Sequence, residues 1–359
     1  MKYQLFCEDK KIKWTITTEE KFMNATMSSE ETKHHPVMLN QILSIISPQH
    51  GGTFIDCTFG GGGYSQAILK FPKTKVFAID RDKLTEKYAN RLVKKFPNRF
   101  NFFQEKFSNL DKIFQENLNP KAIIFDLGLS SFQLADKNRG FSFKSKDFLN
   151  MEMGINEYST YDVINTLDKE YLATIIRVLG EEKDARIIAN KIDKYRKKSP
   201  IKNSQELALI VNDAKKNFNK YKKNPATKTF QAIRIFVNKE LTELILGLIG
   251  AAKLLSNGGI LIVVSFHSIE DKIVKNFFNL YSNLKKNPSR YLPIKENTPS
   301  LFEKIIKKPL IANVQEVEKN IRSRSAKLRY ATRNSNSFFY PNDFKKKFIN
   351  FFELENGRL

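Results

Sequence analysis

The chain has 359 residues and a formal net charge of +23 at pH 7, from 61 Lys and Arg against 38 Asp and Glu. The length allows one large domain with an insertion or two domains, and the charge favours a polyanion such as nucleic acid, unless the lysines merely solvate the surface. Its two cysteines are too few for a disulfide framework or a cysteine zinc site. No run of the sequence reaches the roughly 18 apolar residues that a membrane span needs. We therefore expect a cytoplasmic protein without a metal or membrane partner.

Residues 1–33 carry scattered aromatic and charged residues without a sustained period. We expect an N-terminal extension that is disordered or holds at most a short strand at Trp14–Thr17. The first well-patterned helix is predicted from Pro36 to Ile46.

The segment from Thr53 to Asp126 alternates short apolar runs with amphipathic runs. The pattern predicts strands at 53–56, 75–80, 100–104 and 122–126, with helices at 65–69 and 84–96. This alternation is typical of a parallel sheet covered by helices, so the predicted fold class is α/β and Rossmann-like.

Helical periodicity replaces the strand signal between residues 140 and 225, which predicts a helical insertion. Its expected helices cover 171–179, 185–195 and 204–217, and one long helix follows at 229–255. Beyond the Gly258–Gly259 stop signal we expect strands at 260–265 and 326–331, and a tail with at most a terminal helix.

A run of four glycines, Gly60–Gly63, follows the first expected strand. Residues without a Cβ let the backbone approach a ligand closely, and the second strand ends in Asp80, about 20 residues later, where doubly wound folds hold ribose hydroxyls. The dinucleotide fingerprint would need a third glycine where Ser65 or Gln66 stands. Asp56 and Asp80 therefore favour S-adenosylmethionine, whose sulfonium is a cation, over NAD. The alternative to a cofactor site is a flexible loop followed by an Asp that caps a helix.

Polar or aromatic residues follow each of the five expected strands of this sheet. They are the glycine run, Asp80, Phe107, the segment 126–131 and the segment 265–268. Because the carboxyl ends of parallel strands meet at one edge, we expect the site there. Asp126 closes an apolar strand, so its carboxylate needs a cofactor, a substrate amine or backbone amides as partner, unless it only forms the turn before Gly128.

Four further residues are candidates for substrate binding. Arg139 and Phe141 combine a cation with an aromatic ring and suit an unpaired base, or else form a hinge into the insertion. Arg234 lies on the polar face of the 229–255 helix and could contact phosphates or solvent. His267 is either a base or a structural residue, and Ser268 is predicted to cap the next helix through an S-x-x-D capping box.

The motifs resemble, in order, those of the bacterial 16S ribosomal RNA cytosine-N4-methyltransferase family (MraW-like). They lie at residues 35–39, 56–65, 78–82, 126–133, 139–143, 229–234, 265–271 and 323–333. The resemblance implies a class I methyltransferase sheet with an inserted helical domain. It also implies methyl transfer from S-adenosylmethionine to N4 of a cytosine in the small ribosomal subunit, near the decoding centre.

Carried over by position, the resemblance assigns cofactor binding to Gly62, Gly63, Tyr64, Asp80, Phe107, Asp126 and Gln133. The expected domains are core segments 34–138 and 229–333, a substrate-recognition insertion at 139–228 and a tail at 334–359. Three residues depart from the family pattern: Tyr64 replaces His, Phe132 replaces Pro, and Asn150 replaces Asp.

The lone pair of the cytosine amine is delocalised into the ring, so catalysis would be mostly positioning of an unstacked base. Our hypothesis is that Asp126, with the carbonyls of Leu127 and Gly128, accepts hydrogen bonds from the amine. Open alternatives are another RNA or DNA as substrate, and a non-catalytic ribosome-assembly factor.

Overall fold

The computed structural model describes residues 36–215, 224–282 and 300–357, which belong to one compact unit. The expectations for residues 1–33, including the strand at Trp14–Thr17, lie outside the described residues. The first predicted helix is confirmed as α2, Leu39–Ile46.

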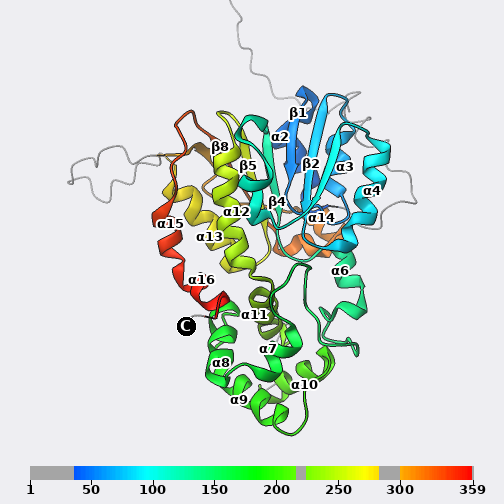
Figure 1. The fold of residues 1–359 in the computed structure, drawn as a ribbon, viewed down its shortest axis with the longest axis vertical. Coiled ribbons are helices and arrows are strands. Elements are labelled where there is room, and N and C mark those ends of the chain that lie inside the picture. The colour runs from blue at the N-terminus through cyan, green and yellow to red at the C-terminus, as the bar shows by residue number, and fades with distance from the viewer. Residues whose placement is uncertain (1–35, 216–223, 283–299, 358–359) are drawn as a thin grey trace, which may run out of the picture. The chain divides into compact units, whose positions relative to one another are not determined.

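The unit is built around an eight-stranded sheet of order β3-β2-β1-β4-β5-β8-β6, with β7 also paired to β8 (Figure 1). The strands are β1 (Gly52–Asp56), β2 (Thr74–Asp80), β3 (Phe100–Gln104), β4 (Ala122–Asp126), β5 (Ile260–Ser265), β6 (Phe302–Ile305), β7 (Leu310–Ile311) and β8 (Lys327–Arg333). The first five are parallel, which confirms the α/β, Rossmann-like prediction. Three C-terminal strands add an antiparallel edge, of which the sequence pattern indicated only β8.

Side chains alternate between the two faces of the sheet and enter two separate cores. Phe54 and Ile124 pack with the helices of one face, whereas their neighbours Ile55 and Phe125 belong to the core of the other face. The first face carries α2, α3 (Gly63–Leu69) and α4 (Glu86–Lys95); the second carries α5 (Leu110–Ile113), α12 (Glu240–Leu254) and α13 (Ser268–Leu280). Both faces are therefore covered, as a parallel sheet requires.

A group of helices lies beyond the carboxyl ends of the strands, at the bottom of Figure 1. They are α6 (Ser131–Ala135), α7 (Thr160–Thr166), α8 (Lys169–Leu179), α9 (Ala185–Arg196), α10 (Ser204–Ala214) and α11 (Thr227–Asn238). The predicted helical insertion is thus present, and its buried residues continue the core of the second face. In the described part of the chain, no helix has the length and apolar character that crossing a bilayer demands.

The prediction of one helix over 229–255 was wrong, because α11 ends at Asn238 and α12 begins at Glu240. Between them Lys239 adopts a left-handed backbone with φ 51°. Its ammonium lies 2.5 Å from a carboxylate oxygen of Glu157 and 2.8 Å from Oδ1 of Asn356. These tertiary contacts hold Lys239 in place, and neither Gly nor Pro marks the break.

The C-terminal tail forms two short helices, α15 (Asn342–Lys347) and α16 (Ile349–Glu355). Glu355 is fully buried, and its carboxylate accepts the N–H groups of Leu241 (3.1 Å) and Thr242 (2.8 Å) in the first turn of α12. The carbonyl of Leu354 accepts the hydroxyl of Tyr171 from α8. The tail thus joins a sheet-covering helix to the helical insertion.

Candidate functional site

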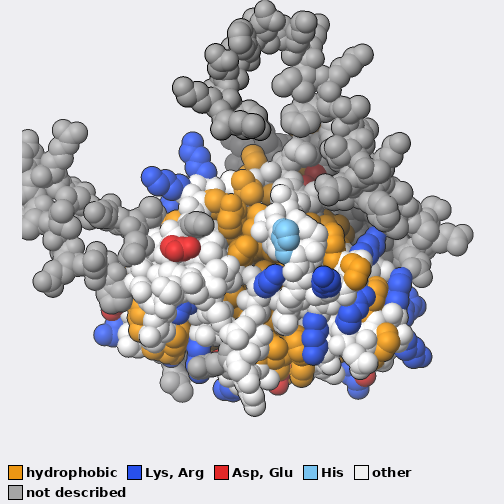
Figure 2. Space-filling view, turned by 90° about the horizontal axis from the view of Figure 1, so that it is seen from above, with side chains coloured by type: hydrophobic (Ala, Val, Ile, Leu, Met, Phe, Trp, Pro, Cys, Tyr) orange, Lys and Arg blue, Asp and Glu red, His pale blue; other side chains and the backbone are white. Residues whose placement is uncertain are grey.

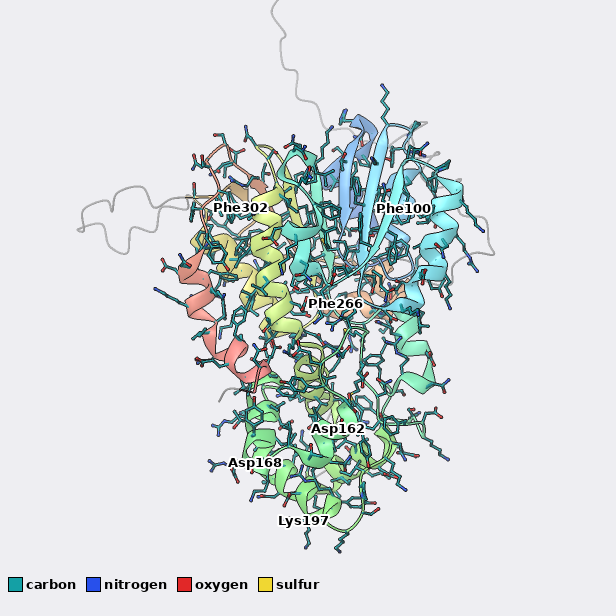
Figure 3. All side chains as sticks on the ribbon, in the orientation of Figure 1. Phe100, Asp162, Asp168, Lys197, Phe266 and Phe302 are labelled. Carbon is teal, nitrogen blue, oxygen red and sulfur yellow. The ribbon has the colours of Figure 1, made fainter. Side chains whose placement is uncertain are left out.

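The carboxyl ends of the parallel strands face the helical insertion. Figure 3 marks Phe266, just beyond β5, between the sheet and the insertion, whereas Phe100 and Phe302 lie on the edge strands β3 and β6. Asp56, Asp80 and Asp126 end β1, β2 and β4 at the same edge. This is the edge at which the strand ends predicted a site.

In the glycine turn after β1, the packing leaves no room for a side chain at Gly62 and Gly63 but does leave room at Gly61. A Cβ on Gly62, whose φ is 79°, would meet the Phe59 ring at 2.8 Å, and a Cβ on Gly63 would meet Pro36 at 2.3 Å. Around Gly61 nothing lies within 4 Å of such a Cβ. The turn therefore leaves open space at its centre, as a ligand-binding turn needs.

Asp80 connects the glycine turn to the segment after β2. Its Oδ2 accepts the N–H of Gly60 at 2.7 Å, and its Oδ1 accepts the N–H of Asp82 at 2.8 Å. Burial raises the pKa of Asp80 to about 7, although these two N–H groups lower it. Each carboxylate oxygen keeps a lone pair, so ligand hydroxyls can still be bound.

Asp126 has one carboxylate oxygen without a partner. Its N–H donates to Oγ1 of Thr58 at 2.7 Å, but Oδ1 is shielded from solvent and makes no hydrogen bond to the described residues. Burial raises the pKa of Asp126 to about 7, while the charge of Arg322 lowers it. Such a carboxyl can gain or lose a proton near neutral pH.

Two other buried residues, Asp56 and Tyr64, lie near enough to Asp126 to act on its pKa. Asp56 accepts a hydrogen bond from Oγ of Ser65 at 2.7 Å, and burial raises its pKa to about 6. Tyr64 is 4 % exposed, its hydroxyl donates to the carbonyl of Val37, and burial raises its pKa. Three carboxyl groups with raised pKa values therefore meet at one edge, an arrangement that favours a cationic ligand.

Gln133 and Arg139 converge on Asp82, a residue that sequence reasoning did not single out. Nε2 of Gln133 and Nη1 of Arg139 donate to the same oxygen of Asp82, at 2.7 and 2.8 Å. Gln133 also forms a capping box with Ser130 at the start of α6. An acidic residue two positions beyond the end of β2 was the available signal for this junction.

Phe141 is buried in the core, and Phe107 is partly buried and packs against the core. Phe107 packs edge-on against Phe125, with ring centroids 5.3 Å apart. Phe141 is 8 % exposed, with the guanidinium of Arg139 lying 5.7 Å from its ring centroid. Arg139 donates hydrogen bonds to Asp82 and to the carbonyl of Glu152, which favours the alternative that this segment is a hinge into the insertion. Base stacking by Phe141 stays a prediction.

Arg234 and His267 lie in a second buried cluster, with Glu240 and Glu270. The guanidinium of Arg234 holds both oxygens of Glu240, at 2.8 and 2.9 Å. Nε2 of His267 lies 3.2 Å from Oε1 of Glu270. Arg234 is thus paired within the protein, and phosphate contact by it stays a prediction.

The capping residue of α13 is His267, so the prediction of Ser268 as the cap was wrong. The His267 ring accepts the N–H of Glu270, and the Glu270 side chain accepts the N–H of His267, which makes a capping box. Ser268 instead donates to the carboxylate of Glu181, and Asp271 pairs with Lys327 and Arg329. The helix begins one residue earlier in the motif than the S-x-x-D pattern indicated.

The three departures from the family pattern have local partners. Besides the hydroxyl contact of Tyr64, the ring of Phe132 packs against Tyr88 with centroids 5.6 Å apart. Oδ1 of Asn150 accepts the N–H of Glu152 at 2.8 Å.

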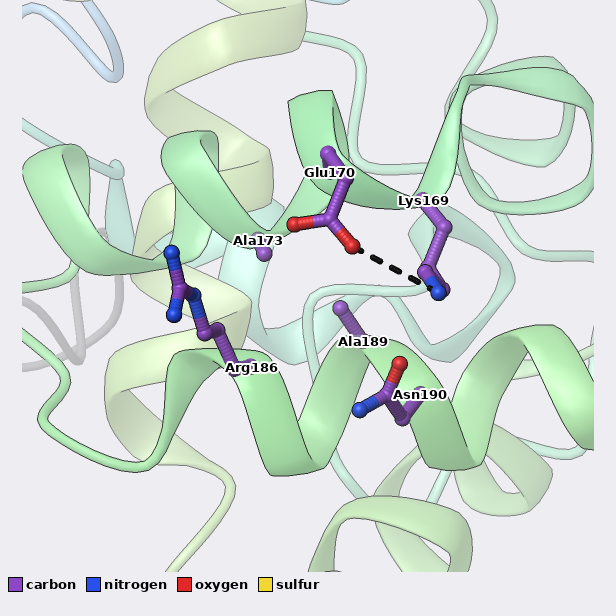
Figure 4. Close-up of a pocket in the computed structure, with 6 residues that line it drawn as sticks. All are labelled: Lys169, Glu170, Ala173, Arg186, Ala189 and Asn190. Atoms are coloured by element: carbon purple, nitrogen blue, oxygen red, sulfur yellow. Dashed lines mark ion pairs between the residues drawn. The ribbon is translucent and has the colours of Figure 1, made fainter.

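The helical insertion carries a surface hollow of about 250 Å³ between α8 and α9 (Figure 4). It is lined by Lys169, Glu170, Ala173, Arg186, Ala189 and Asn190. Lys169 and Glu170 form an ion pair across 3.4 Å. None of the residues predicted to bind a ligand lines this hollow, so the candidate chemistry stays at the strand ends.

The sequence profile of the MraW methylase family matches residues 31–334. The chain belongs to this family. This confirms the resemblance inferred from the motifs, and the matched range includes the strand ends described above.

Among similar MraW methylase sequences is the ribosomal RNA small subunit methyltransferase H of Ehrlichia canis, 45% identical over 299 residues, 82% of this chain and 98% of the relative. The protein of that name from Wolbachia of Drosophila simulans is 44% identical, covering 84% of this chain and 99% of the relative. That of Parvibaculum lavamentivorans is 40% identical, covering 87% and 93%.

Proposed function

We propose that this protein is a methyltransferase that transfers a methyl group from S-adenosylmethionine to N4 of a cytosine in the 16S RNA of the small ribosomal subunit. Membership of the MraW methylase family supports this reaction. The observation that carries the chemistry is the unpartnered Oδ1 of Asp126, beside a glycine turn with open space at Gly61.

The residues at this edge fit S-adenosylmethionine. When bound, the cofactor supplies an electrophilic methyl group on a positively charged sulfur. Asp80 offers lone pairs to ribose hydroxyls, and Asp56 and Asp126 balance a cation in a site of low polarity. The remaining proposed contacts come from Gly62, Gly63, Tyr64, Phe107 and Gln133.

Asp126 is the proposed catalytic residue. Its Oδ1 accepts a hydrogen bond from the N4 amine, which localises the nitrogen lone pair towards the methyl group, and the carbonyls of Leu127 and Gly128 assist. The amine must lose one proton when the N–C bond forms, and a carboxyl with a pKa of about 7 can take that proton. Most of the rate enhancement comes from holding the amine in line.

The proposed substrate is a base unstacked from ribosomal RNA, because the amine of a base paired in a helix could not reach Asp126 at the edge that faces the insertion. The net charge of +23 favours an RNA partner. Figure 2 shows the face at the top of Figure 1, and there too Lys and Arg far outnumber Asp and Glu. Recognition is assigned to the insertion and to Arg139, Phe141, Arg234 and His267, and the reaction would take place in the cytoplasm.

The test is to incubate the protein with methyl-labelled S-adenosylmethionine and small subunits that lack the modification, with protein-free 16S RNA and DNA in parallel. The RNA is then digested and the labelled nucleoside identified. We expect N4-methylcytidine from the small subunit. Intact cofactor binding without label would favour an assembly factor, and label in another nucleic acid would contradict the substrate.

A further inference from the structure

The stretch from Lys319 to Arg333 is strongly basic. It contains six cations and no acidic residue, the cations being Lys319, Arg322, Arg324, Lys327, Arg329 and Arg333. Its first part is a 3-10 helix, η7 (Ile321–Ser325), which follows α14 (Val314–Lys319), and its second part is β8. Figure 1 shows α14, in orange, near the edge of the sheet from which the helical insertion extends.

The helix η7 lies at the same edge of the sheet as Asp126. Lys327, two residues after η7, pairs with Ser265 at the carboxyl end of β5. The guanidinium of Arg322 donates to the carbonyl of Leu129, in the turn that follows Asp126 at the end of β4. The charge of Arg322 also acts on Asp126. A base bound at Asp126 would therefore have η7 beside it.

Two cations of the basic stretch, Lys319 and Arg324, are exposed and make no ion pair or hydrogen bond with any other described residue. The other four form ion pairs or hydrogen bonds within the protein, namely Arg322, Lys327, Arg329 and Arg333. The two cations without partners flank Ile321 and adjoin the proposed reaction site. Cations in such a place suit the phosphate groups of a bound nucleic acid.

Three large apolar side chains are exposed on neighbouring elements of this segment. Ile311 in β7, Val314 in α14 and Ile321 in η7 are 71, 74 and 67 % exposed, and β7 and α14 both contact η7. Apolar side chains gathered on one surface indicate contact with a partner. The adjoining cations favour a negatively charged partner, and single-stranded RNA combines phosphates with the apolar faces of its bases.

The shape of η7 is fixed by contacts inside the protein. Ser323 is buried, and its hydroxyl donates to Oε1 of Glu316 in α14 at 3.0 Å. The same oxygen accepts the N–H of Met38 at 2.5 Å, and Oδ1 of Asn320 accepts the N–H of Arg322 at 3.2 Å. A surface that is ordered in advance loses little conformational entropy on binding.

We propose that η7 and the adjoining Lys319 bind the RNA strand next to the target base, an inference that rests on the proposed function. Lys319 and Arg324 contact phosphates, and Ile321 contacts a ribose or base between them. The strand is held in register by these contacts while the target base leaves its stack and reaches Asp126.

The first experiment removes the two exposed cations in the double variant Lys319→Gln with Arg324→Gln. The matched control is Lys73→Gln with Lys94→Gln, which removes the same charge. Both control residues are exposed, Lys73 directly before β2 and Lys94 in the last turn of α4, so they lie at the opposite edge of the sheet. The Kd for small subunits is measured for wild type and both variants between about 50 and 200 mM salt.

We expect Lys319→Gln with Arg324→Gln to bind small subunits about tenfold more weakly than wild type at low salt. The slope of log Kd against log salt should be smaller by about 1.4, because each phosphate contact of a single strand contributes about 0.7. The control should bind almost as wild type does, and both variants should keep the wild-type melting temperature. Equal affinities and slopes for the two double variants would overturn the proposal.

A photoreactive benzophenone amino acid at position 321 then identifies the partner. Irradiation of its complex with small subunits should crosslink this position to 16S RNA within a few nucleotides of the methylated cytosine. A crosslink to a ribosomal protein, or to RNA far from that cytosine, would overturn the proposal. If wild type forms no N4-methylcytidine, the proposed function fails, whereas the Kd values and the crosslink still decide whether η7 binds RNA.

Discussion

Asp126 carries the proposed chemistry, and Asp126→Asn tests it with almost no change in shape. The amide cannot take the proton of the amine, so we expect the single-turnover rate to fall by about 100-fold or more. Cofactor affinity, measured by calorimetry, should change much less than the rate. A variant with the wild-type rate would contradict the role of Asp126.

The same carboxyl predicts a pH dependence of the rate. Because burial raises the pKa of Asp126 to about 7, the ionised form that accepts the proton is lost as the pH falls through that value. The single-turnover rate of wild type should therefore rise between about pH 6 and 8. A pH-independent wild-type rate would contradict this assignment, and Asp126→Asn should lack the rise.

Stability should change in the opposite direction. Burial raises the pKa values of Asp80 and Asp126 to about 7, above those of the unfolded chain, so folding favours their protonated forms. In the ligand-free protein, the contribution of these two groups to the free energy of unfolding should be largest in acid. It should decrease as the pH rises from about 4 through about 7. Denaturant titrations at several pH values measure this, and Asp80→Asn combined with Asp126→Asn should flatten the decline.

At the residue scale, the sequence identified the side chains but not their partners. Asp80 and Asp126 were expected at strand ends and lie there. Arg139 and Arg234 were candidates for substrate binding, with a hinge and solvent contact as the alternatives. They pair with Asp82 and Glu240, and substrate binding by them stays a prediction. Glu240 follows Arg234 across the break at Lys239, and Asp82 lies far from Arg139 in the chain, so both pairings depend on tertiary structure that local patterns do not contain.

The glycine turn is the element whose variants separate folding from binding. Gly61→Ala adds a methyl group where the protein has open space, so the melting temperature should stay unchanged while cofactor affinity falls about tenfold. Gly63→Ala is the contrasting variant, because its Cβ would meet Pro36 at 2.3 Å and should lower the melting temperature. Unchanged affinity in Gly61→Ala would show that the cofactor binds elsewhere.

The tail helix α16 is expected to stabilise the start of α12. Glu355→Ala leaves the N–H groups of Leu241 and Thr242 without acceptors, and we expect the melting temperature to fall by about 5 °C. Glu355→Gln retains an acceptor and should fall less. Thermal unfolding of both variants checks this, and equal melting temperatures for Glu355→Ala and wild type would contradict it.

At the element scale, the hydrophobic pattern and the turn residues were enough for three strands of the parallel part, since β3, β4 and β5 begin and end where the sequence indicated. The break at Lys239 was missed because an αL residue is normally signalled by Gly or Asn. The strands β6 and β7 were missed because they are short and lie at the antiparallel edge, where they pair with β8.

For the molecule as a whole, the net charge of +23 predicts that substrate binding depends on salt. The KM for small subunits should rise at least about tenfold between about 50 and 200 mM salt, since phosphate contacts release counterions. Cofactor affinity should change little over that range. Steady-state kinetics with each ligand varied measures both, and a KM for subunits that is insensitive to salt would contradict an electrostatic RNA interface.

The central claim is that the strand ends carrying Asp80 and Asp126 form the S-adenosylmethionine site of an RNA methyltransferase. A crystal structure of the full chain with S-adenosylhomocysteine tests it most directly. The account predicts ribose hydroxyls within hydrogen-bond distance of Asp80, the ligand filling the space at Gly61, and its sulfur facing Asp126. A ligand bound at any other place, with this edge empty, would contradict it.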